Sequence, residues 1–490
     1  MQGGYWIESM KKRMEEAAHC NSWRQGRATI FKVPTNLRWW NMKTYDSRVI
    51  HNGPYDPKYV SIGPYHRENS RLQKMEEFKW RMLRVLLGGD RDRMTHLEKC
   101  LEEMEKLEVR ARSSYSEAID MCSKEFVEMM LLDGCFIVFI LAREIKGMRK
   151  ILGDKLRNAG PEGDGGLIAP SNFLWGKLKI DILLLENQIP YFVVETLFEL
   201  LVPPFINEVR TFQPDIILGN SAPNDLAVIA LKGFHPGKTE VPLNLPPNHL
   251  IPCIHHLLHL FYLFIVPAGT GTDQHAGTDT VVQSELTNPP KWIPCVTELQ
   301  TAGVTLKANK DKKFLDVTFC DGVLEIPVLG LYDRTEPILR NLIAFEQCFR
   351  GTEYKVTYYT FFMDCLVNAP QDVSILQKNG IIINWVNDEV EAARLFNELG
   401  IQVNCDEEKN YLSDIYGDLN EYYGKKKKKW MAMLWRNYFD NPWSITSIIG
   451  AFILLLLATT QTAFAINSYY HPRQSSNNLS QYPNRNSLEK

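Results

Sequence analysis

A charge-free apolar segment near the C-terminus places the strongest constraint on this chain of 490 residues. No Asp, Glu, Lys or Arg lies between Asn441 and Tyr470, and residues 445–466 read ITSIIGAFILLLLATTQTAFAI. As a helix this stretch would be about 33 Å long at ~1.5 Å per residue, enough to cross a hydrocarbon core of about 30 Å. The sequence therefore predicts one transmembrane helix over residues 442–466. Its anchoring side chains would include Trp443, Ile445, Phe452, Leu455 and Ile466.

The flanks of this segment predict which side of the membrane the rest of the chain occupies. A run of lysines precedes the segment, whereas only Arg473 and Arg485 follow it closely. Because cytoplasmic flanks carry an excess of Lys and Arg, the large domain is predicted to face the cytoplasm, at the plasma membrane or an endomembrane. The N-terminal residues lack the apolar core of a secretory signal, which agrees with this orientation. The run consists of Lys425, Lys426, Lys427, Lys428 and Lys429.

Three interpretations of the lysine run are open. It is a solvated loop, a nuclear-import signal or a contact to anionic lipid headgroups, and its position beside the span favours headgroup contact. Asn478 begins an Asn-Leu-Ser glycosylation sequon in the tail. Because a sequon is usable only in a lumenal or extracellular tail, it provides a test of the orientation. The first expected partner of the chain is the lipid bilayer.

The composition is that of a folded protein and excludes some functional classes. Apolar residues make up 45% and charged residues 23%, which are near the averages for globular proteins. A net charge of −3 gives no reason to expect nucleic-acid binding, which normally requires a basic domain. The ten cysteines are scattered without a CxxC pair, which argues against zinc-ribbon and thioredoxin-like sites and favours reduced thiols over a disulfide framework.

The chain divides into five parts by composition. Residues 1–29 form an N-terminal segment that is expected to be partly disordered, and residues 30–424 form the main domain. This domain is either one elaborated unit or two lobes, 30–202 and 291–424, joined by the irregular, Pro-rich residues 203–290. The other parts are a basic and aromatic juxtamembrane segment (425–441), the span (442–466) and a polar tail (467–490).

Hydrophobic periodicity predicts that the main domain is mostly helical. Two apolar runs, 129–142 and 257–266, are too short for spans, and the first contains Asp133, so both are predicted to be core helices. Two N-terminal runs, 30–34 and 59–64, are predicted to be short strands, and the Gly-rich residues 153–166 an exposed loop. Helical periods cover residues 72–87, 91–112, 126–143, 178–201 and 336–399.

An alternating pattern over residues 304–331 predicts a β-hairpin, with Asp321-Gly322 as a favoured two-residue turn. Pro327 cannot donate a ladder hydrogen bond, so an edge, a bulge or the end of pairing is expected there. The predicted fold class is therefore α+β, mostly α-helical, with a small antiparallel sheet and one C-terminal transmembrane helix. Pairing about the turn would set Phe319 opposite Leu324, Val317 opposite Ile326 and Leu315 opposite Val328.

Five carboxylates lie inside apolar runs, where an ionisable side chain needs a partner. Such groups include acid–base catalysts with shifted pKa values, but buried structural carboxylates are far commoner. Glu186 begins the sequence Glu-Asn-Gln directly before Ile189-Pro190, where side chains that bind backbone groups are expected. The five carboxylates are Asp133, Asp181, Glu186, Glu346 and Asp364.

Histidines and glycines give weaker signals. His255 and His259 have the i, i+4 spacing of a metal site beside His256, but the glutamate of HExxH and an obvious third ligand are absent. In the stretch that begins at Gly269, Gln274 stands where GxGxxG requires its third glycine. The sequence contains no P-loop, no GxSxG elbow and no kinase signature, so no catalytic residue and no cofactor is assigned.

Several longer motifs occur in order along the chain. Residues 60–66 read VSIGPYH and are followed by Met75-Glu76 and Lys79, and residues 130–137 read MLLDGCFI. Residues 181–192 read DILLLENQIPYF, and later motifs are TEL at 297–299, AGV at 302–304, RNLIAFEQC at 340–348 and Pro442-Trp443. Over residues 30–470 the chain thereby resembles a plant family known as domain of unknown function 247.

The resemblance implies a plant-specific, membrane-associated protein with one C-terminal span and no assigned enzymatic activity. Some grass members of the family are linked genetically to pollen self-incompatibility, which makes a recognition role conceivable. The chain departs from the family at His259, where an acidic residue is common, and in a long Pro-rich insertion before it. Two hypotheses follow: a membrane-tethered recognition, scaffold or signalling protein with a protein partner, and a membrane-bound enzyme that uses buried carboxylates or histidines.

Overall fold

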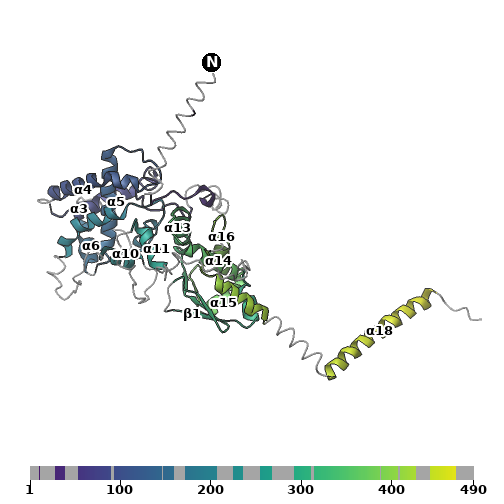
Figure 1. The fold of residues 1–490 in the computed structure, drawn as a ribbon. Helices are drawn as coiled ribbons and strands as arrows, with labels where there is room; N and C mark the ends of the chain where they lie inside the picture. Colours follow the sequence, from purple (N-terminus) through teal and green to yellow (C-terminus); the bar gives the residue numbers. More distant parts are fainter. Residues whose placement is uncertain are drawn as a thin grey trace, which may run out of the picture. The chain divides into compact units, whose positions relative to one another are not determined.

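The computed structural model of the chain is mostly helical and forms two compact units, Met1–Glu421 and Tyr422–Lys490 (Figure 1). Its helices, small sheets and apolar C-terminal helix confirm the predicted α+β fold class. The structure describes residues 10, 28–38, 53–89, 93–145, 147–158, 172–206, 225–234, 254–266, 292–310, 314–386, 388–406, 409–425 and 442–470.

Helix α5 (Ser123–Ala142) is the centre of the N-terminal half of the first unit. All of its residues 129–142 are buried, which confirms the prediction of a core helix. Gly134 allows α5 to approach α8 closely, because a Cβ at this position would lie 2.3 Å from Leu197 Cδ1. The helices in contact with α5 include α3 (Lys74–Leu86), α4 (Arg93–Ser113), α6 (Met148–Asn158), α8 (Tyr191–Leu201) and α10 (Asp225–Phe234).

Further helices of the first unit lie both inside and outside the predicted helical regions. Helix α11 (Leu257–Ile265) is buried along most of its length and contacts α10, so the apolar run 257–266 is a core helix as predicted. Helix α10 itself lies within residues 203–290, where the sequence predicted irregular structure. The region after residue 292 contains α12 (Val296–Thr301), α13 (Thr335–Cys348), α14 (Lys355–Leu366), α15 (Pro370–Lys378) and α16 (Glu389–Leu399).

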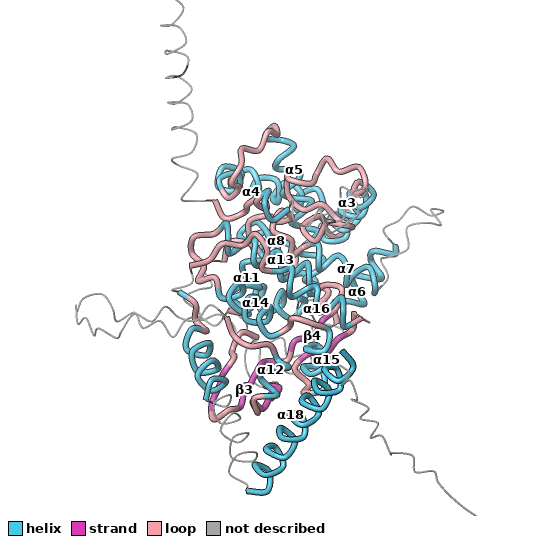
Figure 2. Tube along the Cα trace, turned by 90° about the vertical axis from the view of Figure 1, so that its right-hand side faces the viewer, coloured by secondary structure: helices cyan, strands magenta, loops and turns pink. Residues whose placement is uncertain are grey.

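Two small sheets occur among the described residues of the first unit (Figure 2). One sheet has the strand order β1-β3-β2, with β1 (Thr305–Asn309), β3 (Val323–Pro327) and β2 (Thr318–Cys320). Strands β2 and β3 are antiparallel and pair Phe319 with Leu324, which confirms the predicted hairpin register. Strands β1 and β3 are parallel, as are β4 (Leu329–Leu331) and β5 (Ile382–Asn384), so the first sheet is mixed, the second is parallel, and neither is purely antiparallel.

The hairpin is shorter than the alternating pattern predicted. Its ladder ends where Thr318 pairs with Glu325, and the Val317 backbone N–H donates instead to Leu315 O at 3.1 Å. The two predicted pairs that involve Val317 and Leu315 are therefore absent from the described ladder. Strand β3 ends at Pro327, as expected for a residue that lacks an N–H.

Several predictions of local structure are wrong. Ile30 forms only an isolated parallel bridge with Tyr115, and residues 59–62 pair with no described strand. Gly153 lies inside α6 and not in a loop. The helical pattern over 178–201 is interrupted, because α7 (Asn172–Asp181) ends before a buried turn and α8 begins only at Tyr191. The turn between α7 and α8 and the absence of a strand at residues 59–62 have the same physical reason. In both segments, buried polar side chains form hydrogen bonds with the backbone groups directly.

The second unit contains α18 (Pro442–Tyr470), a helix of 29 residues that includes the whole predicted span with Trp443 and Ile445. The predicted anchors Phe452, Leu455 and Ile466 are 62%, 63% and 53% exposed. Residues Gly450–Asn467 of this helix are the one described stretch that is long and apolar enough to cross a membrane. Lys425 is exposed at the end of a helix over 413–425, whereas Lys426, Lys427, Lys428, Lys429 and Asn478 lie outside the described residues.

Candidate functional site

The chain turns at residues 182–190, between α7 and α8, where its apolar pattern predicted a continuous helix. Gln188 Nε2 donates to the backbone oxygens of Ile182 and Leu184 at 2.6 and 2.8 Å, and Asn187 Nδ2 donates to Asp181 O at 2.9 Å. These side chains take up carbonyls that a continuous helix would use, and Pro190 has no N–H to extend one. The prediction that side chains here bind backbone groups is confirmed.

Asp181 and Asn187 hold residues 58–62 against this turn. The Asp181 carboxylate accepts hydrogen bonds from the three backbone N–H groups of residues 58–60 at 2.6–3.2 Å. Asn187 accepts from the Ile62 N–H at 2.7 Å and donates to Val60 O at 3.0 Å. Buried backbone groups that would need a neighbouring strand are thus satisfied by side chains more than 120 residues away. Burial raises the pKa of Asp181 to about 6.

A buried ion pair joins α3 to α5 beside the same segment. Lys79 Nζ lies 2.5 Å from Asp133 Oδ1 and donates to Ser61 O at 2.6 Å, while Asp133 Oδ2 accepts from the Gly63 N–H at 2.8 Å. Gly63 has a φ of +74°, and a Cβ there would lie 2.5 Å from Gln188 O, so both the conformation and the close approach require glycine. The pair therefore fixes the chain at residues 61–63.

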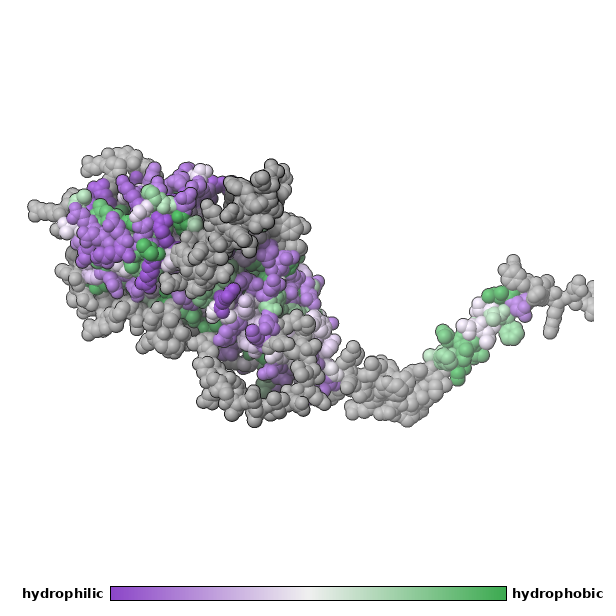
Figure 3. All heavy atoms as spheres, turned by 45° about the horizontal axis from the view of Figure 1, so that its top comes forward, coloured by the Kyte–Doolittle hydropathy of each residue, from purple (hydrophilic) through white to green (hydrophobic). Residues whose placement is uncertain are grey.

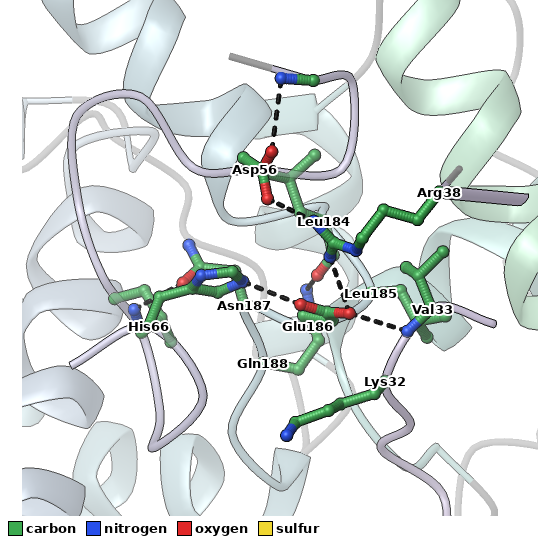
Figure 4. A network of polar contacts seen from close by, with 12 residues as sticks. Lys32, Val33, Arg38, Asp56, His66, Leu184, Leu185, Glu186, Asn187 and Gln188 are labelled. Carbon is green, nitrogen blue, oxygen red and sulfur yellow. Dashed lines mark hydrogen bonds and ion pairs between the residues drawn. The ribbon is translucent and has the colours of Figure 1, made fainter. Parts of the chain in front are cut away.

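Glu186 is the centre of a polar cluster (Figure 4). Its carboxylate accepts from the Val33 backbone N–H at 2.7 Å and lies 2.8 Å from Arg38 Nη2 and 3.0 Å from His66 Nε2. Arg38 also pairs with Asp56 at 2.5 Å and is 29% exposed, whereas Glu186 is 7% exposed. Burial opposes ionisation of Glu186, but the hydrogen bond from His66, the Arg38 charge and the Val33 N–H lower its pKa to about 2.

Glu346 binds the first turn of α14. Its carboxylate accepts from the backbone N–H groups of Val356 and Thr357 at 2.9 and 2.8 Å, and from the Thr357 hydroxyl at 2.6 Å. N–H groups in the first turn have no partner within the helix, so Glu346 replaces the missing acceptors. Burial outweighs these bonds and raises the pKa of Glu346 to about 7. Asp364 lies near the other end of α14, and burial raises its pKa to about 6.

Three histidines lie at the start of α11: His255, His256 and His259. The rings of His256 and His259 bind backbone groups. The rings of His255 and His259 stack with centroids 4.7 Å apart, and His259 Nδ1 accepts from the His255 backbone N–H at 3.2 Å. His256 caps α11, because its Nδ1 accepts from the His259 N–H at 3.2 Å and its Nε2 lies 2.9 Å from Thr29 O. Burial lowers the pKa of His256 to about 3. Within the described ranges, no three metal-ligating side chains gather at one point.

The structure brings three of the five predicted carboxylates, Asp133, Asp181 and Glu186, around residues 56–66. It places Glu346 at the start of α14, in a separate cluster. Each of these carboxylates binds backbone N–H groups or a cation, which for Asp133, Asp181 and Glu186 belong to segments distant in sequence and for Glu346 lie 10 and 11 residues later. In this arrangement the buried carboxylates form hydrogen bonds and ion pairs that hold irregular backbone in place. These bonds replace the backbone–backbone hydrogen bonds of a sheet.

Several partners in these clusters were missed in the sequence. Asn341 on α13 accepts from the Leu185 N–H at 2.8 Å and donates to Pro54 O at 3.0 Å, so it fastens the turn and the N-terminal segment together. Arg38 lies outside any apolar periodic run and gave no signal, and His66 appeared only as the last residue of the motif VSIGPYH. Lys79 and Asn341 each lie at a buried position of a helix. A buried polar residue needs a hydrogen-bond partner, and this was the signal that could have identified both residues.

Comparison with known proteins agrees with the motifs. The family model DUF247, described as a plant protein of unknown function, matches residues 30–457. A UPF0481 protein of Arabidopsis thaliana is 27% identical over 475 residues, which cover 93% of this chain and 89% of that protein. A putative UPF0481 protein of the same plant is 21% identical over 539 residues, which cover 93% of each. No solved structure matches the chain. Because the family model spans most of its length, the chain belongs to this plant family of unknown function, domain of unknown function 247.

Proposed function

We propose that this chain is a membrane-anchored recognition or scaffold protein whose large domain faces the cytoplasm. The observation that carries the proposal is α18, in which no residue of the stretch Gly450–Asn467 is buried. Figure 3 displays hydrophobic side chains along this helix. Such a surface is unfavourable in water and is covered when lipid surrounds it. A core helix of the same composition would be mostly buried, as α5 is.

The buried carboxylates support recognition over catalysis. A catalytic acid or base needs a proton donor or acceptor that substrate can reach. Asp133, Asp181 and Glu346 are 1%, 2% and 0% exposed, and their oxygens bind backbone N–H groups or Lys79. These carboxylates are occupied in stabilising the fold, and we assign them no catalytic step.

An exposed aromatic cluster supports a protein partner. Trp385 is 64% exposed and stacks on Tyr332 with ring centroids 6.2 Å apart, while the Arg334 guanidinium lies 4.9 Å from the Tyr332 ring centroid. Trp, Tyr and Arg are the residues that most often dominate protein–protein binding energy. Ile383, 45% exposed on the adjacent strand β5, extends this surface, which we call the Trp385 patch.

Carbonate extraction of membranes from cells that express the full chain tests the anchor. The wild-type protein is expected to stay in the membrane pellet. Leu455→Arg places a charge near the middle of the span and should release much of the protein, since such a charge costs about 3 kcal/mol or more. Asn467→Arg, at the end of the span, is the matched control and should stay in the pellet. Release of the wild-type protein would overturn the anchor.

Cross-linking in intact membranes tests recognition. Trp385→Ala should abolish cross-links to a defined set of proteins, and a purified member of that set should bind the wild-type chain. Trp80→Ala is the matched control, because Trp80 is also exposed, at 49%, but lies on α3. If every cross-linked protein is equally captured by both variants, the Trp385 patch does not recognise a partner.

A further inference from the structure

Gln461 is a polar residue on the exposed apolar surface of α18. Three threonines nearby satisfy their hydroxyls within the helix: Thr459, Thr460 and Thr462 donate to backbone oxygens three or four residues earlier at 2.7–2.9 Å. No described residue bonds the Gln461 carboxamide, which has two donors and one acceptor with two lone pairs. Gln461 lies five residues before Ile466, or roughly 7 Å inside the predicted span at ~1.5 Å per residue.

A carboxamide at this depth in hydrocarbon needs a hydrogen-bond partner, because no water is available there. Interhelical bonds from Gln side chains stabilise helix association in membranes. The residues around Gln461 on the helix are small enough to let a second helix come close. Ala458 and Ala465 are its neighbours at three and four residues, and Ala451 is seven residues before Ala458. Alanine at every seventh position, on the same stripe as Gln461, lets a second helix pack closely with left-handed crossing.

We propose that α18 pairs in the bilayer with α18 of a second copy of this chain, and that the two Gln461 carboxamides bond each other across the pair. The inference rests on the proposed membrane anchor.

A second copy fits this surface for a specific reason. Copies inserted with the same orientation carry Gln461 at the same depth, and a two-fold axis parallel to the helices sets the two side chains opposite each other. Each carboxamide then donates through its nitrogen and accepts through its oxygen, so one pair of identical side chains satisfies both. The alanines of the stripe meet their own counterparts in the same symmetric contact.

Energy transfer between full-length chains labelled at the N-terminus with donor and acceptor fluorescent proteins tests the pairing in membranes. Wild-type chains should show transfer above that of random proximity at equal surface density. Gln461→Leu keeps the span apolar and should weaken association roughly 3- to 30-fold, which corresponds to one or two interhelical hydrogen bonds.

Two alanine substitutions form a matched pair. Ala458→Ile places a larger side chain on the Gln461 stripe and should weaken association at least as much as Gln461→Leu. Ala463→Ile makes the same chemical change two residues from Gln461, on the opposite side of the helix, and should leave association unchanged. The pairing is overturned if wild-type chains show only random transfer, or if Gln461→Leu and Ala458→Ile both associate like the wild type.

Carbonate extraction of the same membranes separates this inference from the proposed function. If the wild-type chain inserts but does not associate through Gln461, only the pairing is wrong. If the wild-type chain fails to insert, the membrane anchor and the pairing are both wrong.

Discussion

Lys79 on α3 and Asp133 on α5 form an ion pair of 2.5 Å in which both side chains are 1% exposed. The pair is completed by backbone groups of a third segment, since Lys79 also donates to Ser61 O and Asp133 accepts from the Gly63 N–H. Three segments of the chain therefore meet at one pair of charges. Removal of Lys79 leaves Asp133 buried without its counter-charge, which is the costly case for a buried ion pair, whereas removal of Asp133 leaves Lys79 paired with Glu76 Oε1 at 2.5 Å.

Lys79→Met is expected to lower the free energy of unfolding by about 3–5 kcal/mol, because Asp133 then loses its counter-charge in the core. Urea denaturation of the detergent-solubilised full chain measures the change. The double variant Lys79→Met/Asp133→Asn should lose less than the sum of the single variants, since neither position 79 nor position 133 then carries a charge. Arg157→Met, which removes an exposed ion pair with Asp154, is the control and should change stability by under about 1 kcal/mol. A comparable loss for Arg157→Met would contradict this account of Lys79.

Asp181→Asn is expected to release residues 58–60 locally. One carboxylate oxygen becomes an NH₂ group that faces backbone N–H donors, and the cost of the unsatisfied groups is about 1–3 kcal/mol. Hydrogen exchange should become faster at residues 58–60. Asp372→Asn is the matched control, because Asp372 accepts from the backbone N–H groups of Thr297, Asn368 and Ala369. Faster exchange at residues 58–60 in both variants would show a global effect and count against a local role of the Asp181 hydrogen bonds.

Glu346 predicts stability that decreases as the pH rises. Its pKa is raised from 4.5 to about 7 in the folded chain, so the folded state holds a proton that the unfolded state has released between these values. The contribution of Glu346 is therefore fully present below pH 4.5 and is lost as the pH rises through 7. The difference in unfolding free energy between the wild type and Glu346→Gln should fall by on the order of 3 kcal/mol over this range. A difference that is constant with pH would refute the raised pKa.

Glu186 predicts the opposite dependence at lower pH. Its pKa is lowered from 4.5 to about 2, so its contribution is present above pH 4.5 and is lost as the pH falls through 2. The stability advantage of the wild type over Glu186→Gln should therefore grow by on the order of 3 kcal/mol between pH 2 and pH 4.5, and stay level above. Denaturation curves for the wild type and the two variants at matched pH values test both glutamates. If the two stability differences changed with pH in the same direction, the environments described above for Glu186 and Glu346 would be contradicted.

Local patterns predicted those parts of the fold that depend on local rules. The Asp321-Gly322 turn determined which residues face each other, so the pairing of Phe319 with Leu324 could be derived. The apolar run of α5 identified a core helix because its length is too short for a span. The strand predicted over 59–64 was wrong because its N–H groups bind Asp181 and Asn187, which lie more than 120 residues later. No local pattern encodes such a pairing.

The candidate site was predictable to the same limited extent. Asp133 and Glu346 stand out as charges within apolar runs, and the structure gives both of them buried partners. For Asp133 and Glu186 the identity of the partners is a tertiary property, because Lys79 is 54 residues from Asp133 and Val33 is 153 residues from Glu186. Glu346 instead binds residues only 10 and 11 positions later. For His255 and His259 the local pattern was present but pointed to a different role. Their spacing suits a metal ion, whereas His259 Nδ1 accepts a hydrogen bond from a backbone N–H.

The orientation of the span gives the last prediction. Five lysines precede the span and two arginines follow it closely, which favours a cytoplasmic main domain and a tail on the opposite side. In sealed vesicles with the cytoplasmic face outward, protease should digest an N-terminal tag and leave a C-terminal tag intact. Asn478 should then carry a glycan that endoglycosidase removes, and Asn478→Gln should abolish the mobility shift. Protection of the N-terminal tag would show the opposite orientation. The Trp385 patch would then lie in the lumen or outside the cell, and its partner would have to be sought there.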